Sequence, residues 1–232
     1  MKSIGIMQAY FMPYIGYFQL IDAVDEFIIY DNIQYTKKGW INRNRILMGG
    51  TDKYITLPLK KDSDFLDIRD RSLADVFEPL KLLRQIKTAY QKAPYFQETY
   101  ALLETIIPYS DRNLFQYIYY SVIKVCEHLG IRTPIIISSH LNYDNSLKSQ
   151  EKVIAICKER QCDRYVNAIG GMQLYCAEDF AKENIELCFI ETEKTEYPQF
   201  QNEFLPSLSI IDVMMFNSKE AIRAMLQRYR LR

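Results

Sequence analysis

Two short apolar segments near the amino terminus, separated by a loop and a helical stretch, constrain the fold of this chain most strongly. Residues 3–7 and 26–30 are rich in residues that favour β-structure, so each segment predicts a strand. Pro13 and Gly16 interrupt the pattern between them, and residues 17–24 carry apolar side chains at helical spacing. Strand, loop, helix and strand in this order predict a βαβ unit with parallel strands.

The second half of the chain returns to the same alternation. Residues 135–137, 164–169 and 186–190 predict strands, and residues 147–160 and 172–183 predict the helices between them. We expect 135–137 to be buried. A short apolar segment over 207–216 and a last helix capped by Ser218 follow. The sequence therefore predicts an α/β fold in three layers, with a parallel or mostly parallel sheet between helices.

The middle of the chain has a different character. After a polar loop through Arg45, residues 46–57 predict a hairpin closed by Gly49-Gly50, and the charged residues 60–71 predict an exposed connection. Residues 74–130 carry apolar side chains at helical spacing, including Leu80, with breaks at Pro94 and Pro108. We expect one α/β domain over residues 1–232, with residues 74–130 as a three-helix insertion.

Composition excludes several classes of protein. Lys plus Arg and Asp plus Glu number 29 each, so the chain lacks the excess positive charge of a nonspecific nucleic-acid binder. No apolar run reaches the roughly eighteen residues of a membrane span, and the first ten residues do not resemble a signal peptide. The five cysteines form no C-x-x-C pair, which indicates reduced thiols, a cytoplasmic location and no metal site.

Polar groups and glycines follow each predicted strand. Ligands of open parallel sheets bind beyond the carboxyl ends of the strands, so these residues predict a shared site at one edge of the sheet. They are Gln8, Asp31, Ser138-Ser139-His140, Gly170-Gly171 and Glu191.

The segment from Met7 to Asn44 is the strongest candidate for a binding site. It interleaves rings with amides and cations, and ligand sites combine flat apolar walls with a few orienting polar groups. We expect these residues to contact substrate: Gln8, Tyr10, Tyr14, Tyr17, Gln34, Lys38, Trp40, Asn42, Arg43 and Asn44. Arg43, with its basic neighbours, is suited to hold a phosphate or carboxylate; a solvated basic loop is the alternative.

Gly170-Gly171 precedes the helix predicted over 172–183, where exposed amides would bind an anion; a tight turn is the alternative. A phosphate-loop motif is absent.

His140, beside Ser138 and Ser139, is a candidate general base, and Asp31 is the other. The alternative for His140 is an ordinary loop residue. Asp212 lies in an apolar run, where a carboxylate needs a partner. We expect that partner to be a cation or amide of residues 38–45; a helix-capping role is the alternative.

Several of these segments resemble the motifs of the WbqC-like family. Residues 8–18, QAYFMPYIGYF, resemble its opening motif, and the similarity extends over nearly the whole chain. The other matching segments are Tyr30-Asp31, Gln34-Tyr35, residues 38–44, Leu57-Pro58-Leu59, Ser138-Ser139, Gly170-Gly171 and residues 208–212. Ala9 stands where the family usually has proline, which makes the entry to the loop less rigid.

This resemblance implies a cytoplasmic bacterial protein linked with surface-polysaccharide or O-antigen synthesis, in a family described as acyl or aminoacyl (glycyl) transferases. It carries over motif positions without roles: Gln8, Asp31, Trp40, Asn42, Arg43, Asn44, Gly171 and Asp212. The segment from the first strand to Gly16 also resembles, more faintly, nucleotidyl-transfer and ligase folds, but Tyr17 replaces their usual histidine after the glycine.

Our first hypothesis is therefore an enzyme that transfers an acyl or aminoacyl group to the amino group of an amino sugar or sugar nucleotide. Its partners are a small-molecule donor and acceptor, for which a sugar nucleotide and an acyl thioester are candidates. The alternatives are a phosphate-binding nucleotidyltransferase or ligase, and a noncatalytic sugar-nucleotide-binding module. All three hypotheses require Arg43 and Gly171 to line a common pocket. The sequence leaves the cofactor and oligomeric state open.

Overall fold

The amino-terminal βαβ unit forms as predicted. In a computed structural model that describes residues 1–232, β1 (Ser3–Gln8), α1 (Ile15–Asp22) and β2 (Glu26–Tyr30) follow one another. The two strands pair in parallel, with Gly5 opposite Phe27. A Cβ at Gly5 would lie 3.2 Å from Leu20 of α1, so glycine lets the helix pack closely against the strand.

The main sheet has six strands in the order β5-β2-β1-β6-β7-β8. The first five are parallel, which confirms the predicted mostly parallel sheet. An edge strand at the carboxyl terminus, absent from the predicted elements, pairs antiparallel with β7. The bounds not yet given are β5 (Ile135–Ile137), β6 (Arg164–Ala168), β7 (Glu186–Thr192) and β8 (Tyr229–Leu231).

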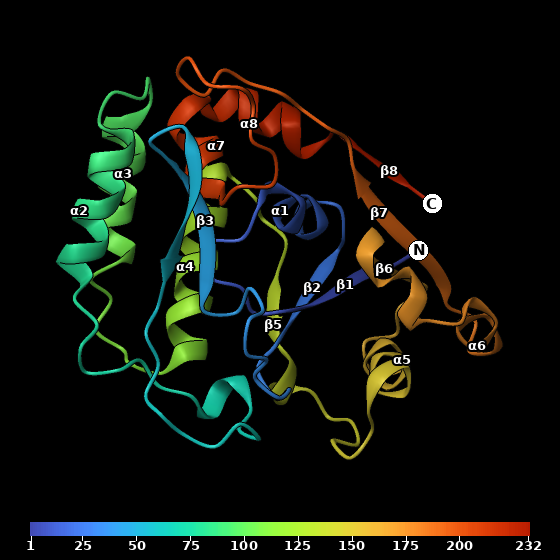
Figure 1. Cartoon of the computed structure of the whole chain (residues 1–232). Coiled ribbons are helices and arrows are strands. Elements are labelled where there is room, and N and C mark those ends of the chain that lie inside the picture. The colour runs from blue at the N-terminus through green and yellow to red at the C-terminus, as the bar shows by residue number, and fades with distance from the viewer.

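Helices cover both faces of this sheet, so the α/β architecture is confirmed (Figure 1). On one face, Ile4 and Ile28 pack in one core cluster with residues of α5 (Ser149–Glu159) and α6 (Ala177–Lys182). On the other face, Phe27 and Ile29 join the larger core cluster with α1, α7 (Ile210–Phe216) and α8 (Lys219–Leu226). This division follows from strand geometry, because successive side chains point to opposite faces.

Three helices form between residues 74 and 130: α2 (Pro79–Tyr90), α3 (Phe96–Ile106) and α4 (Leu114–Leu129). They lie on the side of the molecule away from α6 (Figure 1). Their buried residues belong to the same large core cluster as α1 and β2. Leu80, predicted on the buried stripe, is exposed, and Leu82 is buried instead. That these helices are an insertion into a single domain stays a prediction.

The hairpin is longer than the sequence indicates. β3 (Arg43–Met48) and β4 (Thr51–Thr56) pair along their whole length, so residues 43–45 form a strand rather than the end of a loop. Gly49 and Gly50 have φ values of 63° and 77°, the left-handed conformation that a two-residue hairpin turn requires.

The prediction of an exposed connection over residues 60–71 is wrong at its end. Residues 68–70 form a short 3₁₀ helix, and both Ile68 and Arg71 are buried. The Arg71 guanidinium lies 4.8 Å from the Tyr35 ring and donates a hydrogen bond to the Ser63 carbonyl at 2.8 Å. The cation is therefore buried with partners.

Two predicted elements in the second half of the chain differ from the structure. β5 is only half-buried, because it is an edge strand. The helix predicted over 172–183 is divided into a 3₁₀ helix at Ile169–Leu174 and α6. The apolar segment over 210–216 is helical. Ser218 caps α8 as predicted, its side chain accepting from the Ala221 amide. No helix combines the length and apolar character needed to cross a membrane.

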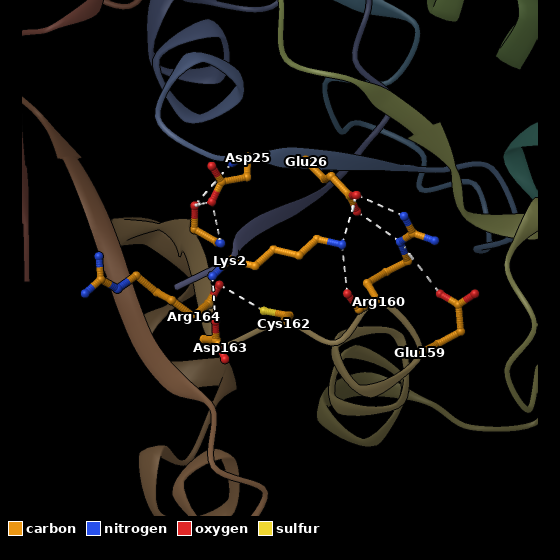
Figure 2. A network of polar contacts seen from close by, with 9 residues as sticks. Lys2, Asp25, Glu26, Glu159, Arg160, Cys162, Asp163 and Arg164 are labelled. Atoms are coloured by element: carbon orange, nitrogen blue, oxygen red, sulfur yellow. Dashed lines mark hydrogen bonds and ion pairs between the residues drawn. The ribbon is translucent and has the colours of Figure 1, made fainter.

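A network of charged groups joins the amino ends of the strands (Figure 2). Arg160, at the end of α5, donates two hydrogen bonds of 2.9 Å to the carboxylate of Glu26 at the start of β2. Lys2 lies 2.9 Å from the same carboxylate. At the next strands, Arg164 pairs with Glu186 at 2.7 Å on a more exposed surface. The edge opposite the predicted ligand site is thus fixed by paired charges.

We expect Glu26→Gln to lower the free energy of unfolding by about 1–2 kcal/mol at pH 7, because it removes a charged bidentate contact. Hydrogen bonds from Arg160 hold the pKa of Glu26 below its usual value, so its stabilisation is present above about pH 4.5. The difference between wild type and variant should disappear as the pH falls through the lowered pKa. Urea unfolding across pH 3–7 measures this.

Glu186→Gln is the matched control, because it removes an exposed pair at the same edge and should cost less than about 0.5 kcal/mol. Equal losses for the two variants, or a loss at Glu26 that does not change with pH, would contradict this account.

Candidate functional site

A cavity of about 510 Å³ lies where the order of the strands reverses. From β1 the chain adds β2 and β5 on one side of the sheet, then crosses to add β6 and β7 on the other. Such a topological switch point leaves a crevice at the carboxyl ends of its two strands, where α/β proteins bind ligands. We call this the switch-point cavity. Its lining includes Gln8, Tyr10, Tyr30, Gln34, Thr36, Ser149, Lys152, Asn167, Gly170, Gly171 and Tyr175.

Lys152 is the one cation in this lining. Its side chain is buried, with the residue only 7% exposed, and no carboxylate lies within ion-pair distance. The ammonium donates to the Asn32 carbonyl at 2.9 Å and lies 5.3 Å and 5.6 Å from the rings of Tyr30 and Tyr143. Burial lowers the pKa of Lys152, partly offset by Asp67 and Asp31. An ammonium with three N–H groups and one protein acceptor is suited to bind an anion.

Lys152 is not among the site residues predicted from the sequence, although the sequence pattern holds a signal for it. Val153, Ile156 and Cys157 form the buried stripe of α5, and Lys152 occupies a position on the same stripe. A lysine on the apolar side of an amphipathic helix is unusual and marks a functional candidate.

Gly170 and Gly171 line the cavity, but not at the start of a helix as predicted. They lie within the 3₁₀ helix at Ile169–Leu174, and α6 begins only at Ala177. A Cβ at Gly171 would lie within van der Waals overlap of the Asn167 side chain, whereas a Cβ at Gly170 would meet open space. Gly171 therefore allows the Asn167 amide to pack against the backbone that forms the cavity wall.

A second cavity, of about 280 Å³, adjoins the first across Tyr10, which lines both. We call it the aromatic cavity; its lining is Tyr10, Pro13, Tyr14, Trp40, Asn44, Arg45 and Ser207. Trp40 is 40% exposed, stacks with Tyr54 at 6.3 Å between centroids, and lies 5.5 Å from the Arg45 guanidinium. The structure thus brings Tyr10, Tyr14, Trp40 and Asn44 together, as a ligand site in this segment requires.

Three of the residues predicted to contact substrate form hydrogen bonds within the protein. Asn44 donates to the carbonyls of Phe11 and Met12 at 3.2 and 2.8 Å. Asn42 accepts from the Tyr35 hydroxyl and donates to the Leu57 carbonyl. The fully buried Tyr17 donates to the Gln8 carbonyl at 2.9 Å, and burial raises its pKa. These bonds fix the shape of the loop between β1 and α1.

Arg43 does not share a pocket with Gly171, so that prediction is wrong. Its guanidinium donates to the carbonyls of Lys38 and Gly39 at 2.5 and 3.1 Å and lies over the Tyr54 ring. The Arg43 side chain thus stabilises the turn that precedes it in the chain. In this turn Lys38 is exposed and has a φ of 65°. Arg43 and Lys38 line neither cavity.

Asp31 and the two serines after β5 form a closed network. One carboxylate oxygen of Asp31 accepts from the Ser138 hydroxyl at 2.8 Å and the Ser139 amide at 3.0 Å. The other oxygen accepts from the Ser139 hydroxyl at 2.6 Å. The buried carboxylate thereby ties the end of β2 to the turn at Ser138–His140. The Ser138 hydroxyl also lies 2.7 Å from Asn32 Oδ1, and the carbonyl of Asn32 is the acceptor of Lys152.

His140 is exposed and lines neither cavity. Both serine hydroxyls have acceptors other than the imidazole: that of Ser139 donates to Asp31, and that of Ser138 lies within hydrogen-bond distance of Asp31 and Asn32. The geometry therefore gives no support to His140 as a general base, nor to Asp31, whose oxygens are occupied.

The predicted partner of Asp212 is also wrong. Its carboxylate accepts from the hydroxyls of Tyr90 and Tyr197 at 2.7 and 2.8 Å and from the Gln199 amide at 2.7 Å. No residue of the 38–45 segment contributes. Burial raises the pKa of Asp212, and these three donors oppose the shift. Asp212 is an internal anchor that lines neither cavity.

We expect Gly171→Ala to lower the free energy of unfolding by about 1–3 kcal/mol, because the added methyl group overlaps the buried Asn167 amide. Gly170→Ala is the control at the adjacent position and should change stability by less than about 0.5 kcal/mol. Denaturant unfolding of both variants measures the difference. If Gly171→Ala proves as stable as Gly170→Ala, Asn167 does not constrain this position.

The fold and the cavity define an α/β protein with a cavity at a topological switch point and a buried lysine in its wall. The chain belongs to the WbqC-like protein family, whose model matches residues 8–224. It is 28% identical over 224 residues to the uncharacterized protein Rv1507c of Mycobacterium tuberculosis, which covers 95% of this chain and 96% of the relative. No solved structure gives a significant match to the chain.

Proposed function

We propose that this protein is a cytoplasmic transferase that moves an acyl or aminoacyl group to the amino group of an amino sugar or sugar nucleotide in bacterial surface-polysaccharide synthesis. The observation that carries the proposal is Lys152: a buried ammonium without a carboxylate partner, in the wall of the switch-point cavity. A buried cation is costly unless an anion compensates it, so the cavity is suited to a phosphate-bearing ligand.

The surroundings of Lys152 suit the other parts of a sugar nucleotide. Ser149, the first residue of α5, lines the same cavity, so the positive end of the helix dipole adds to the ammonium. The rings of Tyr10, Tyr30 and Tyr175 provide flat apolar walls, and Gln8 and Gln34 provide amides. The part of the cavity beside Lys152 and Ser149 thus suits a phosphate group, and the remaining part suits a ring.

The aromatic cavity gives the reaction a second binding site. A group transfer needs donor and acceptor to be held side by side, because proximity supplies much of the rate enhancement. The two cavities share the Tyr10 side chain, so ligands in them would approach each other across this ring.

A noncatalytic sugar-nucleotide-binding module is the second candidate, because no histidine or carboxylate lines the switch-point cavity. Tight binding without turnover of any donor–acceptor pair would favour it. A nucleotidyltransferase or ligase is the third, favoured by the switch-point position, where α/β folds bind nucleotides. Release of pyrophosphate from ATP would identify it. Assays of acyl transfer from a coenzyme A thioester to an amino-sugar nucleotide separate the first candidate from both.

We expect Lys152→Met to weaken binding of a uridine diphosphate sugar roughly ten- to a hundredfold, since a hydrogen bond to a charged group contributes about 1.5–3 kcal/mol. Methionine keeps the length of the side chain without its charge. Thermal-shift titration measures the affinity, because a ligand that binds only the folded state raises its stability. The control is Lys148→Met, which removes an exposed lysine just before the same helix.

The free protein should lose no stability in Lys152→Met. Because burial lowers the pKa of Lys152, the unfolded chain binds the proton more tightly, and the ammonium destabilises the fold at neutral pH. That penalty should diminish as the pH rises towards the ordinary lysine value of 10.5. Retained stability with unchanged nucleotide affinity would contradict the proposed role of Lys152.

A further inference from the structure

The ammonium of Lys152 lies near two tyrosine rings that come from different parts of the chain. Its Nζ is 5.3 Å from the ring centre of Tyr30, at the end of β2, and 5.6 Å from that of Tyr143. Tyr143 belongs to the segment between the 3₁₀ helix Ser138–His140 and α5. Tyr30 lines the switch-point cavity, whereas Tyr143 does not. Any effect of the Tyr143 ring on a ligand in this cavity must therefore pass through Lys152.

Tyr143 is also tied to the residue that supplies the acceptor of the ammonium. The side-chain nitrogen of Asn32 donates to the Tyr143 hydroxyl at 2.9 Å and to Asn145 Oδ1 at 2.8 Å, which uses both of its N–H groups. The main-chain carbonyl of Asn32 accepts from Lys152 at 2.9 Å. A ring and a carbonyl that are joined by a hydrogen bond thus fix the place of the ammonium.

The kind of group around Lys152 decides how much of its charge a ligand meets. An aromatic face attracts an ammonium and favours its charged form without adding a negative charge. A carboxylate at ion-pair distance would favour the charged form too, but it would neutralise the ammonium and compete with an anionic ligand. Burial lowers the pKa of Lys152, Asp67 and Asp31 oppose this shift, and Arg69 adds to it. The rings and the Asn32 carbonyl also oppose the effect of burial, at direct contact, and none of them carries a charge.

We propose that Tyr143 is a positioning residue of the switch-point cavity, whose ring holds Lys152 as an uncompensated ammonium with two N–H groups available to an anionic ligand. The segment before α5 thereby controls a charged group in the cavity wall without entering the cavity. That the ligand is a nucleoside diphosphate derivative rests on the proposed function. The effect of Tyr143 on Lys152 does not depend on it.

An NMR titration of the protein with carbon-13-labelled lysine side chains tests this effect directly. The Cε signal of Lys152 is identified by its absence in Lys152→Met. Tyr143→Leu should lower the pKa of Lys152 further below its ordinary value, because burial remains and the ring is lost. Tyr143→Phe keeps the ring and should titrate close to the wild type. Tyr119→Leu, which removes a half-buried tyrosine of α4, is the matched control and should change nothing at Lys152.

Affinity for uridine diphosphate at pH 7, measured by calorimetry, shows whether the effect reaches a ligand. We expect Tyr143→Leu to weaken binding about three- to tenfold and Tyr143→Phe to stay within about twofold of the wild type. In a protein that already carries Lys152→Met, Tyr143→Leu should weaken binding no further, because Tyr143 acts only through the ammonium. A merely structural role would weaken binding in both backgrounds.

The role of Tyr143 is overturned if Tyr143→Leu leaves the pKa of Lys152 unchanged, or if it weakens binding equally with and without Lys152→Met. If Tyr143→Leu does not fold, pentafluorophenylalanine at position 143 replaces it, because this residue keeps the size of the ring and removes the negative potential of its face. It should lower the pKa of Lys152 relative to Tyr143→Phe. Wild-type protein that does not bind uridine diphosphate would reject the proposed function, while a lowered pKa of Lys152 in Tyr143→Leu would still support the role of Tyr143.

Discussion

The parallel pairing of β1 with β2 on one side and β6 on the other is the constraint on which the remaining structure depends. Both ladders run in the same direction, so Gln8, Tyr30 and the residues after Ala168 all emerge at one edge of the sheet. Because the chain leaves β1 towards β2 and later returns beside β1 with β6, no crossover covers this edge. The switch-point cavity is therefore a consequence of strand order, and its side chains supply only its chemistry.

The loop between β1 and α1 turns this edge into a site with more than one compartment. Distant backbone groups fix it: the Phe11 amide donates to Ile41, Ser209 donates to the Met12 carbonyl, and the Ile210 amide donates to Pro13. Held by the Asn44 amide, the loop places Tyr10 between the switch-point cavity and the aromatic cavity. It places Tyr14 between the aromatic cavity and a third cavity, which Gln19 and Thr192 also line. Gly16 belongs to this arrangement, because a Cβ there would overlap the Tyr14 ring and Thr192.

What the sequence predicts well is local, and what it misses depends on distant contacts. The βαβ unit, the hairpin turn and the Ser218 cap follow from spacing and turn chemistry within a few residues. Asp212, by contrast, finds Tyr90, which lies 122 positions away, and Asp31 finds Ser138 at 107 positions, so neither partner could be inferred from neighbours. The residue type of Arg43 predicts an anionic ligand, yet two carbonyls of its own turn accept its hydrogen bonds.

The distribution of charge across the sheet argues that the carboxyl edge is adapted for binding at the expense of stability. At the amino edge Lys2, Arg160 and Arg164 all have carboxylate partners. At the carboxyl edge Lys152 is buried against rings and one carbonyl, and no carboxylate pairs with it. A fold selected for stability alone would place methionine or leucine on this stripe of α5, where the other residues are apolar. Natural proteins depart from such local rules mainly at functional sites, and a cation that weakens the empty fold gains its compensation when an anion binds.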